Sequence, residues 1–135
     1  MGVQMKELTV FAKDRVGLLA DLTKILGEKG INIEYLYSET VGTYAVLHLM
    51  VDSEDLAAHT LEREGFTVVR FDMLVVELPN KPGAIAGLAG KLAEAEIDIK
   101  CSYFLQRSKS KGLFALRVDK MEDAKRILKG YAVKG

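Results

Sequence analysis

Two four-residue turns hold the side chains best placed for binding chemistry. Asp14-Arg15-Val16-Gly17 and Asn80-Lys81-Pro82-Gly83 stand 66 residues apart, and each connects an apolar run to an amphipathic one. We interpret each as a strand-to-helix turn, where the first backbone N–H groups of the helix lack a partner within the helix. A glycine at the end of the turn lets a small ligand approach that backbone. The alternative interpretation is that Asp14 and Asn80 only cap their helices.

Other candidate residues point to structural roles. His48 and His59 have no accompanying residue at metal-ligand spacing, so we predict no metal site. Cys101 is the only cysteine, which rules out an intrachain disulfide and favours a buried apolar role. No serine or cysteine has the sequence context of a catalytic nucleophile. We therefore predict no catalytic residues and no cofactor, in a protein that is not an enzyme.

The turns belong to a regular series of elements. Apolar runs at residues 7–12, 31–37, 44–51 and 66–71 predict four strands. Leucines at helical spacing predict one helix after the first turn, and N-cap chemistry before residue 56 predicts another. The predicted order of elements in the first half is β-α-β-β-α-β.

The second half repeats this series at an offset of 66 residues, which becomes 67 after the second hairpin. Matched pairs include Leu22 with Leu88, Ile31 with Ile97 and Tyr37 with Tyr103. The repeat ends with a predicted helix at 121–129 and a short fourth strand at 131–133. An internal repeat of this regularity predicts two paired domains, residues 1–71 and residues 72–135.

Each repeat has two helices, which can cover only one face of a small sheet. Right-handed crossovers place both helices on the same side. We therefore predict an α+β fold, a ferredoxin-like βαββαβ sandwich in two tandem copies whose antiparallel sheets pair side by side. Such a small unit is marginal alone, and apolar residues such as Phe11 and Val46 fall on the uncovered face. Both points favour pairing of the repeats and a homodimer.

Both halves resemble the ACT domain. Beside the two turns, the resemblance rests on Gly30-Ile31-Asn32-Ile33 and Glu96-Ile97-Asp98-Ile99 in the second strand of each half. ACT domains are regulatory modules that usually bind an amino acid between two paired units. The resemblance implies a free-standing, non-catalytic sensor of a free amino acid. The residues implied in ligand binding are Asp14, Arg15, Val16, Gly17, Leu18, Asn32, Ile33, Asn80, Lys81, Pro82, Gly83, Ala84, Ile85 and Asp98.

The resemblance also implies which residues share a site. The turn of one half would face the second strand of the other, so that Asn80 joins Asn32 and Asp14 joins Asp98. An Asn amide can accept a hydrogen bond from the ligand ammonium and donate one to its carboxylate, whereas an ionised Asp can only accept. We predict that the Asn80/Asn32 site is the competent one, and that the Asp14/Asp98 site is empty or prefers a cationic ligand.

Charge sets the remaining expectations. The 19 basic and 19 acidic residues give a net charge of zero, which argues against a general attraction to nucleic acid or membrane. Residues 1–66 carry 6 basic and 11 acidic side chains, whereas residues 67–135 carry 13 and 8. The chain starts without an apolar signal segment, and no apolar run reaches the ~20 residues that span a bilayer. We expect a cytoplasmic protein.

Two other functions remain open. The chain could be the regulatory small subunit of a separate amino-acid biosynthetic enzyme, which would be its partner. Alternatively, ferredoxin-like sheets with exposed aromatics read single-stranded RNA, and Lys111-Gly112-Leu113-Phe114 faintly resembles their motif. The one basic run, 107–111, lies in a predicted hairpin loop without a recognition helix or a stacking aromatic nearby. We therefore expect neither a nucleic-acid nor a membrane partner.

Overall fold

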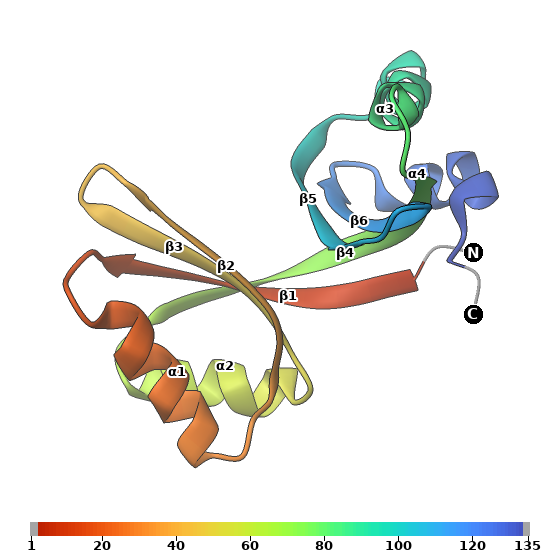
Figure 1. Cartoon of the computed structure of the whole chain (residues 1–135). Helices are drawn as coiled ribbons and strands as arrows, with labels where there is room; N and C mark the ends of the chain where they lie inside the picture. The colour runs from red at the N-terminus through yellow and green to blue at the C-terminus, as the bar shows by residue number, and fades with distance from the viewer. Residues whose placement is uncertain (1–2, 134–135) are drawn as a thin grey trace. The chain divides into compact units, whose positions relative to one another are not determined.

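The computed structural model describes residues 3–133, which divide into two compact units (Figure 1). The first unit is Lys6–Phe71. The second unit is the chain after Phe71 together with the start of the first strand. Each unit has its own hydrophobic core, so each is described separately.

The first unit is a four-stranded sheet with two helices on one face. Its strands lie in the order β2-β3-β1-β4, and β3 pairs antiparallel with both of its neighbours. The strands are β1 (Val3–Lys13), β2 (Ile33–Val41), β3 (Tyr44–Val51) and the start of β4 (Thr67–Pro79). Helices α1 (Leu18–Glu28) and α2 (Glu54–Arg63) lie on the same side of these strands (Figure 1). The predicted ferredoxin-like arrangement is confirmed for this unit.

The core of the first unit lies between the sheet and the helices. Leu18, Leu22 and Leu26 recur at helical spacing on α1, and all three are buried. Strand alternation turns Leu8 and Val10 of β1 toward them, in the same buried cluster. This packing fixes where β1 ends and α1 begins, and thus the position of the first turn.

The other face of the first sheet holds a buried polar cluster. The Glu7 side chain is 1% exposed, and it accepts a hydrogen bond from Thr9 Oγ1 at 2.9 Å. His48 Nδ1 lies 3.3 Å from Glu7 Oε2, and the His48 ring stacks on Tyr37 with 5.8 Å between centroids. A buried carboxylate requires such a partner, and Thr9 supplies one. His48 lies beside this carboxylate, and its structural role stays a prediction.

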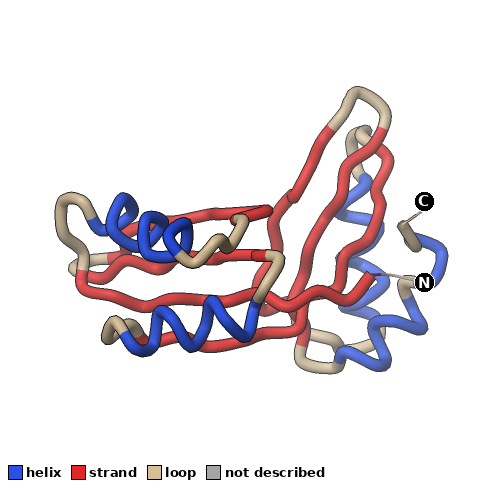
Figure 2. The backbone as a smooth tube through the Cα atoms, turned by 90° about the horizontal axis from the view of Figure 1, so that it is seen from below, coloured by secondary structure: helices blue, strands red, loops and turns tan. Residues whose placement is uncertain are grey.

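The second unit has the strand order β1-β4-β6-β5. Its β6 (Lys111–Val118) pairs antiparallel with β4 and with β5 (Ile99–Arg107). Figure 2 shows its two helices, α3 (Ala84–Glu94) and α4 (Met121–Ile127), on one side of its strands. The buried residues of these helices include Leu88, Leu92 and Ala124, which pack with Leu74 and Val76 of β4.

Two expectations are wrong. The strand predicted at 66–71 does not end there: β4 starts at Thr67 and continues to Pro79, because no glycine or proline interrupts the chain before Pro79. The segment 131–133, predicted as a fourth strand, contains none: its first residue ends a short 3-10 helix, Lys129–Tyr131, and residues 132–133 have no regular structure. In the second unit the position beside β4 is occupied by β1, so a strand at 131–133 has no place there.

Candidate functional site

Each predicted turn ends at a glycine that begins a helix. Gly17 precedes α1 with φ 88°, and Gly83 precedes α3 with φ 85°. Residues with a Cβ rarely adopt this left-handed backbone conformation, which explains why both positions are glycine. Among the described residues no side chain caps either helix. The capping interpretation of Asp14 and Asn80 is therefore wrong, and the first amides of both helices have no side-chain partner.

The Asp14 turn borders a cavity of about 390 Å³ in the first unit. The backbone N–H of Asp14 donates to the carbonyl oxygen of Thr43 at 2.9 Å, which ties the turn to the β2–β3 hairpin. Asp14 and Glu39 both line the cavity. Arg15 lines it too, but its Nη2 lies 2.8 Å from Asp21 Oδ2, so that its charge is already balanced. The walls of this cavity are therefore acidic.

The Asn80 turn borders a smaller cavity, about 170 Å³, in the second unit. The backbone N–H of Asn80 donates to the carbonyl oxygen of Ser110 at 3.0 Å, and its Nδ2 donates to that of Ser108 at 2.7 Å. Its Oδ1 accepts a hydrogen bond from Arg107 Nη2 at 2.9 Å. Lys81 and Arg107 line the cavity, whose described lining includes no carboxylate. The walls of this cavity are therefore basic.

The two cavities occupy corresponding places in the two units. Positions 66 residues apart line both cavities: Asp14 and Asn80, Arg15 and Lys81, Leu18 and Ala84, Leu19 and Ile85, Ser38 and Phe104. After the hairpin, Ala45 and Gly112 correspond in the same way. Phe104 is larger than Ser38, in agreement with the smaller second cavity. Val16, Pro82 and Gly83 belong to the turns but do not line these cavities.

Asn32 and Asp98, predicted to complete the sites, lie at the opposite end of each unit from the turns. The Asn32 N–H donates to Asp52 Oδ1 at 3.1 Å, and the Asp98 N–H donates to Asp119 Oδ1 at 3.0 Å. Ile33, the first residue of β2, lies at the same end as Asn32. The nine residues of β2 span about 26 Å. Neither unit therefore brings its own turn and its own second-strand residue together.

Asp98 also has a charged partner. Lys100 Nζ lies 2.7 Å from Asp98 Oδ2. The hydrogen bond and the negative charge of Asp98 raise the pKa of the Lys100 ammonium above its ordinary value of 10.5. Both side chains are exposed, so the pair contributes little to stability. The pair nevertheless balances the Asp98 carboxylate, which makes this end of the unit less acidic than its sequence implied.

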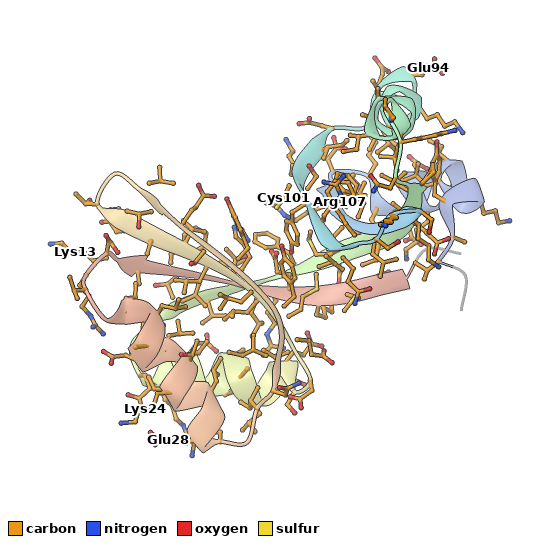
Figure 3. The ribbon with its side chains drawn as sticks, in the orientation of Figure 1. Lys13, Lys24, Glu28, Glu94, Cys101 and Arg107 are labelled. Atoms are coloured by element: carbon orange, nitrogen blue, oxygen red, sulfur yellow. The ribbon has the colours of Figure 1, made fainter. Side chains whose placement is uncertain are left out.

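The sequence interpretation missed Arg107 and Phe104 as site residues. Arg107 is the last residue of β5 (Figure 3), and its guanidinium carbon lies 4.7 Å from the centroid of the Phe104 ring, a cation–π distance. We had interpreted Arg107 only as the start of a basic hairpin loop. A comparison of the two halves at the offset of 66 could have found both residues. Val41 and Ser38 stand at the corresponding positions of the first half, and neither is cationic or aromatic.

Two further searches concern other classes of site. Residues 3–133 contain no group of three or more His, Cys, Asp and Glu side chains arranged to hold a metal ion. In the same part of the chain, none of the helices combines the length and the apolar character that a bilayer crossing requires. Cys101 lies on β5 and is partly buried.

Residues 6–64 match the family model of the ACT domain. The match runs from β1 through α2 and includes both the Asp14 turn and Asn32. The match lies within the first unit and covers less than half of the chain, and over this part it agrees with the resemblance seen in the sequence. A search of curated proteins gave no match.

Solved structures resemble nearly the whole chain. Protein BT0572 from Bacteroides thetaiotaomicron is 25% identical, with a TM-score of 0.84 over 96% of this chain and 89% of that one. The ligand-free regulatory subunit of aspartate kinase from Thermus thermophilus is 15% identical, with a TM-score of 0.67 over 97% of each chain. The corresponding subunit from Thermus flavus is also 15% identical, with a TM-score of 0.68 over 96% and 94%. This chain shares its fold with these proteins.

Proposed function

We propose that this protein is a non-catalytic regulatory sensor that binds a free amino acid at its turn cavities. The ACT domain match at residues 6–64 supports the regulatory class. We also propose that the unit after Phe71 is a second ACT repeat, since its elements β4, α3, β5, β6 and α4 repeat the order of β1, α1, β2, β3 and α2 in the first unit. The observation that carries the proposal is the pair of corresponding cavities, each bordered by a helix start without a side-chain cap and by a polar turn residue.

Asn80 supplies the chemistry that an amino acid needs. Its amide is held by Ser108 and Arg107, so the orientation of its oxygen and nitrogen is fixed before a ligand arrives. One lone pair on Oδ1 and one hydrogen on Nδ2 remain for the ligand. The ammonium binds the first, and the carboxylate binds the second and the amides at the start of α3. Such preorganisation reduces the entropy cost of binding.

The second-strand residue of another repeat completes each site in this proposal. The separation of about 26 Å between the first turn and Asn32 within one unit supports this arrangement. Asn80 is then joined by Asn32, and Asp14 by Asp98, within one chain or between two copies. Strands β2 and β5 are the edges of their units, and an edge strand offers unpaired backbone groups to a second chain. We propose that the chain forms a homodimer through these edges, and that ligand occupancy stabilises one arrangement of its repeats.

A thermal-shift screen of the twenty amino acids tests the proposal. A ligand at 100 times its dissociation constant adds about 2.7 kcal/mol to the free energy of unfolding, which raises the melting temperature by several degrees. We expect such a rise with one amino acid or a small chemical group of them. A flat response to all twenty would contradict the proposal.

The second candidate function is that of a regulatory small subunit acting on a separate enzyme in the cytoplasm. It is favoured by the two Thermus proteins of the same fold, which are regulatory subunits of aspartate kinase. Affinity purification of the tagged chain from its own cells tests this candidate. Co-purification of an amino-acid biosynthetic enzyme supports it, and recovery of the chain alone argues for a free-standing sensor.

A further inference from the structure

The cavity beside Asn80 contains a cation in a defined position. Arg107 donates through Nη2 to Asn80 Oδ1 at 2.9 Å, and its guanidinium lies over the Phe104 ring at 4.7 Å from the centroid. A guanidinium has five N–H donors, and Asn80 uses one of them. Although Arg107 is an exposed residue, two different contacts thus hold its head group at the cavity wall.

The Phe104 platform is itself packed. Its ring meets Phe114 edge to face, with 5.0 Å between centroids. Gly112 lies directly beneath, because a Cβ added there would stand 3.1 Å from the Phe104 ring and from the carbonyl oxygen of Gln106. Glycine therefore lets the ring rest against the sheet. Arg107 is supported by a fixed surface instead of extending freely into solvent.

The charge of Arg107 is not balanced. In the part of the chain that the structure describes, neither Arg107 nor Lys81 has an acidic partner. Arg107 also borders a neighbouring cavity of about 440 Å³, where Glu77 is present, but Lys111 Nζ lies 3.3 Å from the Glu77 carboxylate. The described lining of the cavity beside Asn80 thus has two positive charges and no carboxylate to balance them.

The first unit has the same turn and cavity but no cation at the position of Arg107. Val41 stands at the position corresponding to Arg107, and Ser38 at that of Phe104. Where the first unit has its own cation, Arg15, that residue is paired with Asp21 at 2.8 Å. The turn and its cavity therefore form without an arginine on the second strand of the unit.

We propose that the cavity beside Asn80 selects a dicarboxylic effector, an acidic amino acid whose side-chain carboxylate pairs with Arg107. This inference rests on the proposed function, which places the ammonium and the α-carboxylate at Asn80 and the start of α3. The free edge of the guanidinium matches a carboxylate in a bidentate pair, the strongest arrangement for such groups. Lys81 adds a second positive charge at the same wall.

Calorimetry on the full chain with L-glutamate and L-aspartate, each compared with its neutral amide L-glutamine or L-asparagine, tests the inference. We expect an acidic ligand to bind at least roughly tenfold more tightly than its amide. Arg107→Gln should abolish that preference, and Arg107→Lys should retain part of it because it keeps the charge but loses the bidentate geometry. Lys109→Gln is the matched control, because it removes a cation from the same hairpin without altering the cavity lining.

The outcomes separate this inference from the proposed function. If a neutral amino acid binds as tightly as the acidic ones, or if Arg107→Gln leaves the preference intact, the inference is wrong while the amino-acid sensor stands. If none of the twenty amino acids binds, the sensor proposal is wrong and the inference falls with it. Thermal melting of each variant without ligand shows whether it is folded. If Arg107→Gln is not folded, a reduced preference for the acidic ligand in Arg107→Lys provides the test.

Discussion

The cavities beside Asp14 and Asn80 have the same frame and opposite charge. In both, a left-handed glycine begins a helix that no described side chain caps, and corresponding positions form the walls. The first cavity has Asp14 and Glu39 on its walls and a cation that is already paired. The second has Lys81 and Arg107 and no carboxylate in its described lining. The comparison teaches that the backbone frame makes the cavity, whereas a few side chains decide what it can hold.

The two glycines provide the largest expected effect. Gly17→Ala and Gly83→Ala should each lower the free energy of unfolding by about 1–2 kcal/mol, because alanine is strained at φ 88° and φ 85°. A Cβ at Gly83 would meet nothing within 4 Å, so the loss comes from the backbone and not from a clash. Urea denaturation measures both values.

The same pair of variants separates the two cavities. Only Gly83→Ala should also weaken amino-acid binding, since it alters the helix start beside Asn80. Equal loss of binding in both variants would show that the cavities do not differ as we describe.

A smaller effect is expected where the repeat is imperfect. Glu96 has φ 58° at the position that corresponds to Gly30, whose φ is 72°. Glu96→Gly should raise the free energy of unfolding by roughly 0.5 kcal/mol, because relief of the strain exceeds the added entropy of the unfolded chain. Gly30→Ala should lower it instead. Paired urea melts measure both, and a destabilised Glu96→Gly variant would be the contrary result.

Most of the helices, strands and turns could be predicted from the sequence. Hydrophobic periodicity located helix α1 through Leu18, Leu22 and Leu26, and alternation gave β3 as Tyr44–Val51. These signals are local, since each depends on which face of one element is buried. The turns could be found from a local signal too. In each, a glycine stands where the spacing of apolar residues changes from that of a strand to that of a helix.

The missing features depend on contacts between distant segments. The strand expected at 131–133 has ordinary strand residues, but its place beside β4 belongs to β1. Arg107 donates a hydrogen bond to Asn80, 27 residues earlier in the chain, and no local sequence pattern predicts this contact. The failure of Asp14 and Asn80 to cap their helices has a similar cause, because hydrogen bonds to the neighbouring hairpins position both turns.

The smallest expected effect concerns Asp98, which the acidic-site prediction had treated as an unbalanced charge. Asp98→Asn should return the raised pKa of Lys100 toward 10.5, as measured by NMR titration of its side chain. The sign of the linkage follows from a raised folded-state pKa. The small stabilisation by this pair is present below pH 10.5 and is lost as the pH rises through the folded-state pKa. An unchanged Lys100 titration would mean that Asp98 is not its partner in solution.

The central claim is that the cavity beside Asn80, and not the cavity beside Asp14, binds the amino acid. Isothermal titration of the best ligand from the thermal-shift screen into Asn80→Ala and Asp14→Ala tests this claim directly. We predict that Asn80→Ala weakens binding at least roughly tenfold, because the ligand loses both amide hydrogen bonds and Arg107 loses its anchor. Asp14→Ala should leave the affinity within about twofold of the unaltered chain. Intact affinity in Asn80→Ala together with lost affinity in Asp14→Ala would contradict the account.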